Sequence, residues 1–154
     1  MSSSSNLSSN IKSLHEENYQ LWLESTIDNL KQGNFDRIDI DNLIEEISEM
    51  GGSLKDALEN NLIVILAHLL KWQYQPQKRS GSWKASIKEH RRRINKSIQK
   101  HPYLKKYYEK IFSESYLPAV DWAMEETGLS PETFPSQCPF TPEQVLNDQF
   151  LPGD

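Results

Sequence analysis

Apolar residues recur every three or four positions between Asp39 and Pro76, the spacing that places side chains on one side of an α-helix. Asp39 is a candidate N-cap, because its carboxylate can accept hydrogen bonds from the free amides of the first turn. Pro76 ends the helix, since proline disfavours helical backbone in the residue before it. The pattern predicts one long helix, and a break at the glycine pair 51–52 is the alternative. The apolar positions are Ile40, Leu43, Ile44, Ile47, Met50, Leu54, Leu58, Leu62, Ile65, Leu69 and Trp72.

The second half of this helix, residues 62–70, is apolar on almost every side. A helix without a polar face is surrounded by other elements, so this segment predicts the centre of a helical bundle. Nine residues are too few to cross a membrane, which needs about 20. We therefore expect no membrane partner.

The same helical period predicts three further helices, over residues 13–33, 83–100 and 102–128. Ser13 and Glu16 have the spacing of a capping box at the start of the first helix. Ser82 can cap the second helix. Gly33 and Gly128 are expected to end the first and third helices in the left-handed conformation.

Five prolines mark residues 129–154 as an irregular strap. Thr141 and Gln144 form a second capping box, with Pro142 at the first helical position, which predicts a short helix to about Asn147. Residues 1–12 are serine-rich and predict a disordered tail. No strand pattern is present. The predicted fold is all-α: a single-domain antiparallel bundle of four main helices around the long central one, spanning residues 13–154 with the strap.

Charge is strongly segregated along the chain, although the net charge is only −5. Residues 1–70 carry four basic and twelve acidic side chains, residues 71–110 carry thirteen and two, and residues 111–154 carry none and eight. The basic middle segment fits a nucleic-acid contact. It also fits a segment that lies between two acidic neighbours and is neutralised by them. Both interpretations stay open at this point.

Antiparallel pairing of the central helix with helix 83–100 brings two histidines to the same level. His68 then faces Glu89, next to His90 and Arg91. Both histidines can be hydrogen-bonded core residues. They can also form a metal or acid–base site together with a carboxylate. A third interpretation is an anion site made by His68, Arg79, Lys84 and Arg91.

The candidate functional cluster is the set of polar and aromatic residues around this level and the adjoining turn: His68, Trp72, Gln75, Arg79, Trp83, Glu89, His90 and Arg91. Cys138 is the single cysteine, which excludes an internal disulfide and a cysteine zinc site. No phosphate-binding glycine loop and no nucleophile elbow are present. We therefore predict no metal and no cofactor, and the sequence favours a non-enzymatic protein. Residues 1–10 lack the apolar core of a leader, so we expect a cytoplasmic location.

Several short motifs resemble one known family. They are Asn42-Leu43-Ile44-Glu45-Glu46-Ile47, Met50-Gly51, the run from His68 to Pro76, Arg79-Ser80-Gly81-Ser82-Trp83, Glu126-Thr127-Gly128-Leu129, Phe134-Pro135 and Cys138-Pro139-Phe140. Together they resemble the helical family catalogued as domain of unknown function 29, whose members are mostly cyanobacterial. The resemblance covers about residues 19–152. It implies an all-α fold and no assigned activity, and the family pattern often has glutamine where this chain has His90.

Three functions follow as hypotheses. The first is a protein-interaction or self-association module, in which opposite charges on the basic middle and acidic ends allow association between copies. The second is a nucleic-acid-associated protein or nuclease that uses Lys71, Arg79, Lys84, His90 and Arg91 against phosphates. The third is a metal-dependent hydrolase at His68.

Overall fold

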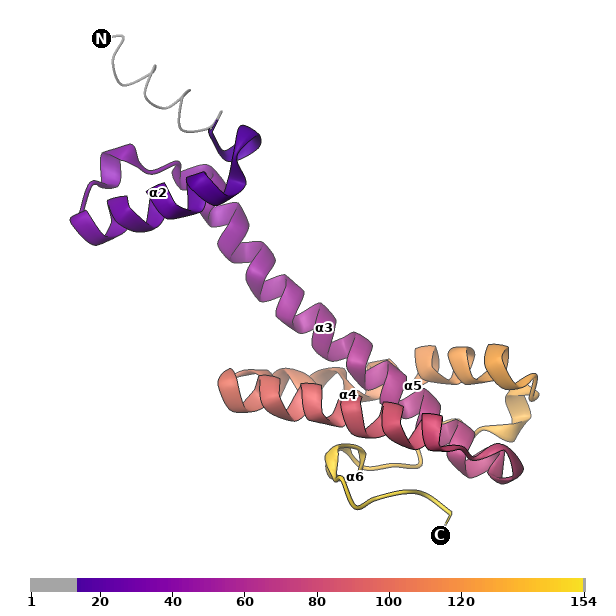
Figure 1. Cartoon of the computed structure of the whole chain (residues 1–154). Helices are drawn as coiled ribbons and strands as arrows, with labels where there is room; N and C mark the ends of the chain where they lie inside the picture. The colour runs from indigo at the N-terminus through magenta and orange to yellow at the C-terminus, as the bar shows by residue number, and fades with distance from the viewer. Residues whose placement is uncertain (1–13, 154) are drawn as a thin grey trace. The chain divides into compact units, whose positions relative to one another are not determined.

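The computed structural model describes residues 14–153, and all regular elements in this range are helical (Figure 1). Besides a helical turn at residues 14–17, the described range has four long helices and one short helix, α6. Three single turns of 3₁₀-helix connect them. The elements are α2 (Tyr19–Gln32), η1 (Phe35–Arg37), α3 (Ile40–Tyr74), η2 (Pro76–Lys78), α4 (Gly81–Lys100), α5 (Leu104–Thr127), η3 (Pro131–Thr133) and α6 (Pro142–Leu146). The predicted all-α fold is confirmed.

The long helix α3 runs without interruption through Gly51 and Gly52, so the alternative of a break at the glycine pair is wrong. A carboxylate oxygen of Asp39 accepts a hydrogen bond from the backbone amide of Asn42 at 3.3 Å, which confirms Asp39 as the cap. The helix stops two residues before Pro76, as expected from the restriction that proline places on its predecessor.

Two helix starts differ from the prediction. Ser80, not Ser82, caps α4, because its hydroxyl oxygen accepts from the backbone amide of Trp83 at 3.2 Å. Residues 14–17 form a separate helical turn, after which the side chain of Asn18 caps α2 through the amide of Leu21 at 3.0 Å. The backbone of Asn18, with φ −147° and ψ 87°, is not helical and interrupts the predicted helix over 13–33. Ser13, its predicted capping box and the predicted tail lie outside the described residues.

Three caps agree with their sequence signals. Gly33 and Gly128 end α2 and α5 with φ of 75° and 73°, a conformation that glycine adopts at little cost. Thr141 and Gln144 form both hydrogen bonds of the capping box that opens α6. The short helix therefore lies where the strap was predicted to contain one.

The chain divides into two compact units, residues 1–52 and 53–154. Unit 1 contains α2, η1 and the first part of α3, and unit 2 contains the rest of α3 with α4, α5 and the strap. The single-domain organisation over residues 13–154 remains a prediction.

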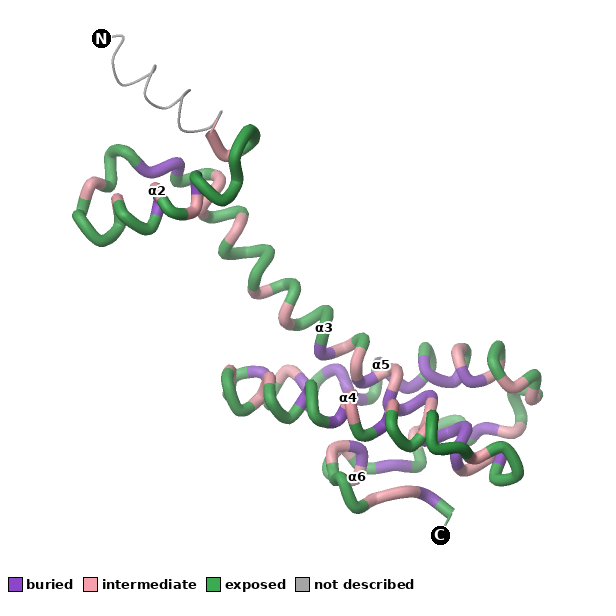
Figure 2. Tube along the Cα trace, viewed as in Figure 1, coloured by how far each residue is buried: buried purple, intermediate pink, exposed green. Residues whose placement is uncertain are grey.

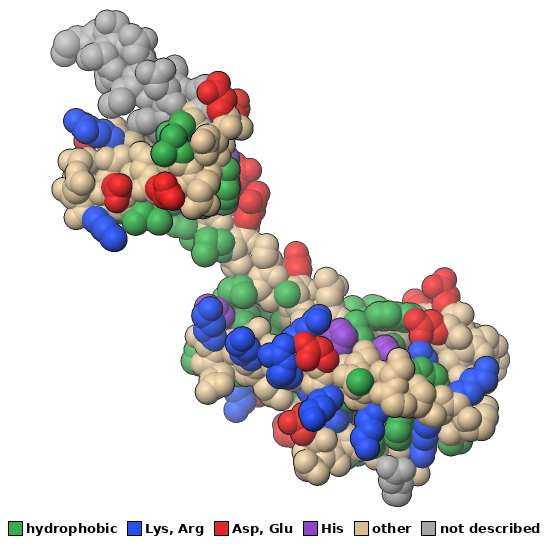
Figure 3. Space-filling view, viewed as in Figure 1, with side chains coloured by type: hydrophobic (Ala, Val, Ile, Leu, Met, Phe, Trp, Pro, Cys, Tyr) green, Lys and Arg blue, Asp and Glu red, His purple; other side chains and the backbone are tan. Residues whose placement is uncertain are grey.

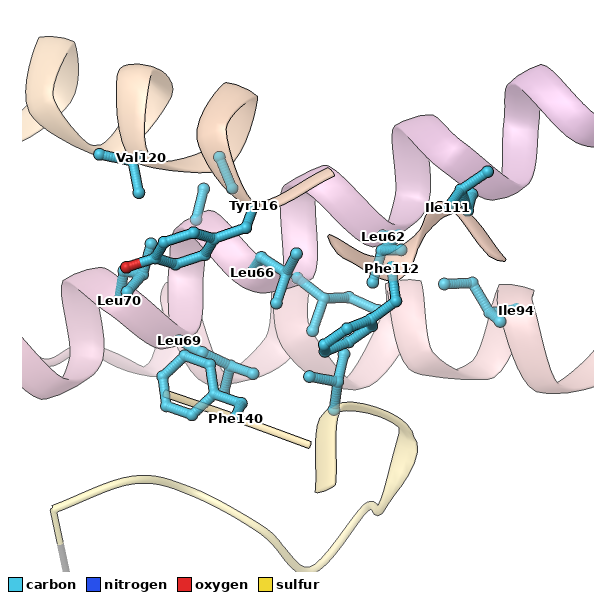
Figure 4. Close-up of a cluster of buried hydrophobic side chains, with 14 of the residues drawn as sticks. Leu62, Leu66, Leu69, Leu70, Ile94, Ile111, Phe112, Tyr116, Val120 and Phe140 are labelled. Atoms are coloured by element: carbon cyan, nitrogen blue, oxygen red, sulfur yellow. The ribbon is translucent and has the colours of Figure 1, made fainter. Parts of the chain in front are cut away.

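Unit 2 holds a large hydrophobic core around the second part of α3. Leu62, Ile65, Leu66, Leu69 and Leu70 have no exposed surface, so most of residues 62–70 is enclosed by neighbours, whereas Ile63, Val64 and His68 are half-buried. Figure 4 shows side chains from α4, α5 and the strap surrounding these leucines. Among the described residues, no helix has the length and apolar character that a membrane span requires.

Unit 1 has a much smaller core. Its buried side chains in the described range are Trp22, Thr26, Ile38 and Asp39. The ring of His15 packs edge-on against Trp22, with the ring centres 4.6 Å apart. Figure 2 shows the contrast: buried positions are frequent in unit 2, whereas most of unit 1 is exposed or intermediate.

Candidate functional site

The two histidines of the candidate cluster are half-buried, and each is fixed by its own helix. The Nδ1 of His68 donates to the carbonyl oxygen of Val64 at 2.9 Å, and the Nδ1 of His90 donates to that of Ser86 at 2.7 Å. Because a carbonyl oxygen only accepts, Nδ1 carries the proton in both neutral rings. Nε2 of each ring is then the nitrogen with a free lone pair, available to accept a proton or bind a metal.

The environment of His68 disfavours its charged form. Burial lowers the pKa of His68 most, and the positive charge of Lys71, with that of His90 when its ring is protonated, lowers it further, against the hydrogen bond to Val64 and the charge of Glu126. Of these influences on the pKa of His68, that of His90 is the smallest. At neutral pH the His68 ring is neutral.

Lys71, which is buried, forms an ion pair beside His68 with a carboxylate that is exposed. Its ammonium group bonds to the carboxylate of Glu126 from α5 and lies 4.6 Å from the centre of the Trp83 ring, a cation–π contact. Lys71 is buried and lowers the pKa of the Glu126 carboxyl through this bond. The indole of Trp122 donates to the same carboxylate, and its ring faces His68 edge-on at 6.3 Å. The position next to His68 is therefore filled by Lys71, which is already bound to Glu126 and does not leave an open anion site.

Glu89 does not take part in this cluster. It accepts hydrogen bonds from Arg92 and Arg93 on the outer side of α4, and these bonds lower the pKa of the Glu89 carboxyl to about 2. The carboxylate near His68 is instead Glu126, which lies 58 positions further along the chain. The predicted pairing involved only residues 62–70 and 83–100, so it did not indicate that a carboxylate from α5 lies near His68.

Arg91 holds the C-terminal strap. The side chain is 2 % exposed, and its guanidinium donates to the carbonyl oxygens of Val145 at 2.7 Å, Phe150 at 2.8 Å and Gln144 at 3.4 Å. The three carbonyls belong to α6 and the chain after it. Arg91 therefore has a structural role that its exposed neighbours in the sequence do not share.

Arg79 makes a similar contact at the end of α3. It donates to the carbonyl oxygen of Trp72 at 2.8 Å and to that of Pro152 at 3.3 Å. The guanidinium also lies 5.0 Å from the centre of the Trp72 ring, and both Trp72 and Gln75 are buried. Arg79 and Arg91 thus bind strap carbonyls, and the structure gives no support to an anion site that joins them to His68.

Two hollows lie along α4 next to the strap. One, of about 370 Å³, is lined by Lys84, Lys88 and Arg91 with Asp148, and the other, of about 440 Å³, is lined by Lys88, Arg92 and Lys96 with Asp148. Figure 3 shows Lys and Arg side chains along this helix. The basic character of the middle segment is therefore displayed on the surface of α4.

The described residues contain no group of three or more His, Cys, Asp or Glu side chains placed to hold a metal ion. The His68–His90 pair accordingly lacks a third ligand among them. The hypothesis of a metal-dependent hydrolase gains no support from this geometry.

The pH dependence of stability provides a test of the His68 environment. Because the folded state lowers the pKa of His68, the unfolded chain takes up the proton first as the pH falls, and stability is lost below the ordinary histidine pKa. His68→Asn keeps a donor near the Val64 carbonyl but removes the titration. We expect urea unfolding at pH 7.5 and pH 5 to show a smaller loss of stability for the variant. Equal losses in both proteins would contradict this assignment.

A further surface lies at the start of α3, and the sequence pattern alone did not mark it as exposed. Ile40, Ile44, Ile47 and Met50 form one stripe on α3, yet they are 50 %, 59 %, 59 % and 65 % exposed. We call these four residues the α3 stripe. The spacing was visible in the sequence, but periodicity shows only that a helix has an apolar side, not what covers it.

Comparison with known proteins gives a family and no characterised relative. No curated protein and no solved structure matches the chain. One family model matches residues 14–151, which is nearly the whole chain and includes both histidines, Lys71, both strap-binding arginines and the α3 stripe. The chain therefore belongs to the family described as domain of unknown function DUF29.

Proposed function

We propose that this protein is a protein-interaction module that acts through the exposed apolar surface of unit 1. The observation that carries the proposal is the distribution of exposed large hydrophobic side chains. Nine of the eleven in the described range lie in unit 1, and unit 2 has only Tyr103 and Leu117. The nine are Tyr19, Leu21, Ile27, Leu30, Phe35, Ile40, Ile44, Ile47 and Met50.

The concentration of these side chains in one small unit matters more than their number. Scattered apolar residues are normal on protein surfaces, but contiguous apolar patches of several hundred Å² mark interaction sites. The α3 stripe is contiguous, because its members are spaced by four and then three residues on one helix. Figure 3 shows hydrophobic side chains at the surface of this part of the chain.

Photo-crosslinking in cells tests this proposal whatever the identity of the partner. A benzophenone amino acid replaces Ile47 in the α3 stripe, and in the control it replaces Leu117, an equally exposed residue of unit 2. We expect irradiation to produce adducts of higher mass from position 47 and none from position 117. Adducts of equal yield at both positions, or none at position 47, would contradict the proposal.

The basic surface of α4 supports a second candidate, a nucleic-acid-binding protein. Lys84, Lys88, Arg92 and Lys96 follow one another at intervals of four residues, about 6 Å along a helix, and all four are exposed. Lys71, Arg79 and Arg91, which the sequence hypothesis included, are bound to protein groups instead. The candidate contact is thus restricted to the outer face of α4, where Arg92 also bonds to Glu89.

Salt dependence tests this second candidate. If α4 neutralises four phosphates, the affinity for a labelled oligonucleotide should fall by about 100-fold between 50 and 200 mM salt. Fluorescence anisotropy measures the affinity, and the double variant Lys88→Gln/Lys96→Gln should reduce both the affinity and its salt dependence. The absence of binding at 50 mM salt would remove the candidate.

A further inference from the structure

The α3 stripe belongs to a heptad pattern, in which positions a and d of a seven-residue repeat are apolar. Ile40 and Ile47 occupy the a positions, and Leu43 and Met50 occupy the d positions. Ile44 adds an apolar residue at an e position. This spacing is that of a helix which packs against another helix along a seam.

The polar residues of this segment keep to the positions away from the seam. Asp41 and Ser48 fall at b, Asn42 and Glu49 at c, and Glu45 at f. Acidic charge is therefore directed to the opposite side of α3, although unit 1 as a whole is acidic. A second helix can approach the seam without meeting these carboxylates.

The residues that flank the seam decide what kind of helix fits. The e positions are Ile44 and Gly51, which carry no charge. Glu46, at the intervening g position, accepts hydrogen bonds from Tyr19 at 2.6 Å and from His15 at 3.1 Å within unit 1. Charged residues at e and g normally select the partner of a coiled coil. Here the e positions are uncharged and Glu46 is bound within unit 1, so these positions do not demand an oppositely charged helix and do not exclude an identical one.

We propose that a second copy of this chain binds the α3 stripe, so that two α3 helices pair along residues 40–50. This inference rests on the proposed function and names its partner. Isoleucine at a with leucine at d favours two-stranded pairing, and this segment has isoleucine at both a positions and leucine or methionine at both d positions. The assembly is a homodimer.

The apolar area agrees with a dimer of ordinary size. At about half exposure, each of the four stripe residues offers on the order of 100 Å². The stripe then supplies about 400 Å² per copy. A standard interface uses about 800 Å² per partner, somewhat more than half of it apolar. The stripe alone accounts for nearly all of that apolar part.

Sedimentation equilibrium of the purified full-length chain over a wide concentration range is the experiment. The test variant is Ile47→Glu, which places a charge on the seam, and the matched control is Ser48→Glu, the adjacent exposed position outside it. We expect a dimer for the wild type and the control, and a dissociation constant at least about 100-fold higher for Ile47→Glu. Circular dichroism verifies that helicity is unchanged, and Met50→Lys, at a residue that is 65 % exposed, provides a second variant of the seam.

The remaining outcomes overturn the inference. A wild type that stays monomeric up to about 100 μM, or a dimer that Ile47→Glu and Met50→Lys do not weaken, would show that copies do not pair on the seam. A dimer that separates at high salt would be held by charge, since apolar contacts are not weakened by salt. A monomer that still forms crosslinks to another protein from position 47 would refute the second copy and leave the proposed function standing.

Discussion

Replacing Arg91 with methionine is expected to lower the free energy of unfolding by about 3 kcal/mol, because a buried charged donor that binds several acceptors is worth more than an ordinary hydrogen bond. Methionine preserves most of the side-chain length but donates nothing. The carbonyl oxygens of Val145 and Phe150 then lose the Arg91 donor, and water can replace it only if the strap separates. The carbonyl oxygen of Gln144 keeps its bond from the backbone amide of Asn147 at 3.1 Å.

Urea unfolding of the full chain measures this effect, and the adjacent residue provides the control. Arg92 is exposed and bonds to Glu89 on the same helix, so Arg92→Met should leave the free energy of unfolding nearly unchanged. We also expect faster proteolysis after residue 128 in the Arg91 variant than in the wild type. Equal stability of the two variants would contradict the structural role of Arg91.

Leu66→Ala is expected to lower the free energy of unfolding by about 3 to 4 kcal/mol, the cost of emptying a fully enclosed leucine site. Leu66 has no exposed surface, and Figure 4 shows it among Leu62, Leu70, Phe112 and Tyr116. The surrounding side chains come from different helices and cannot all move into the cavity.

The same substitution at an exposed site is the control for the core prediction. Leu117 is 65 % exposed, so Leu117→Ala should cost about 0.5 kcal/mol or less in the same urea titration. A small effect at Leu66 would mean that residues 62–70 are not enclosed as described, and the centre of unit 2 would lie elsewhere.

Periodicity and turn residues were enough to predict the helices. The long α3 helix, the glycine caps and the capping box of α6 each depend on residues within a few positions of one another. Local rules govern such features, which is why the sequence alone was informative. The error at Ser82 is a choice between two nearby serines, and at Asn18 a cap residue interrupts a helix that the periodicity predicted to be continuous.

The partners of the polar side chains could not be predicted in the same way. Lys71 bonds to Glu126 and Arg91 to the chain around Val145, groups more than 50 positions away. The thirteen basic residues of the middle segment look alike in the sequence, yet Lys71 and Arg91 are buried while Arg92 is exposed. Which of these basic residues is buried depends on where α5 and the strap pack against α3 and α4.

The sequence also did not show where along α3 the exposed part ends and the buried part begins. Apolar residues continue at the same spacing from Ile40 to Trp72, although Ile47 is 59 % exposed and Leu66 is enclosed. A helix needs the same pattern whether its neighbour belongs to its own chain or to another one. The structure supplies the missing information, because it shows where the described part of the chain leaves the stripe uncovered.

Because Arg79 and Arg91 bind carbonyl oxygens of the strap, the attachment of the strap should respond little to acid. An arginine keeps its proton at any ordinary pH, and a peptide carbonyl has none to gain or lose. The attachment of the C-terminal segment by this means should therefore be indifferent to acidification, unlike the bond between Lys71 and Glu126, whose carboxylate titrates. Because Lys71 lowers the pKa of Glu126, only acid below the ordinary carboxyl pKa would weaken this link between α3 and α5, and the attachment of residues 129–153 by the arginines would outlast it.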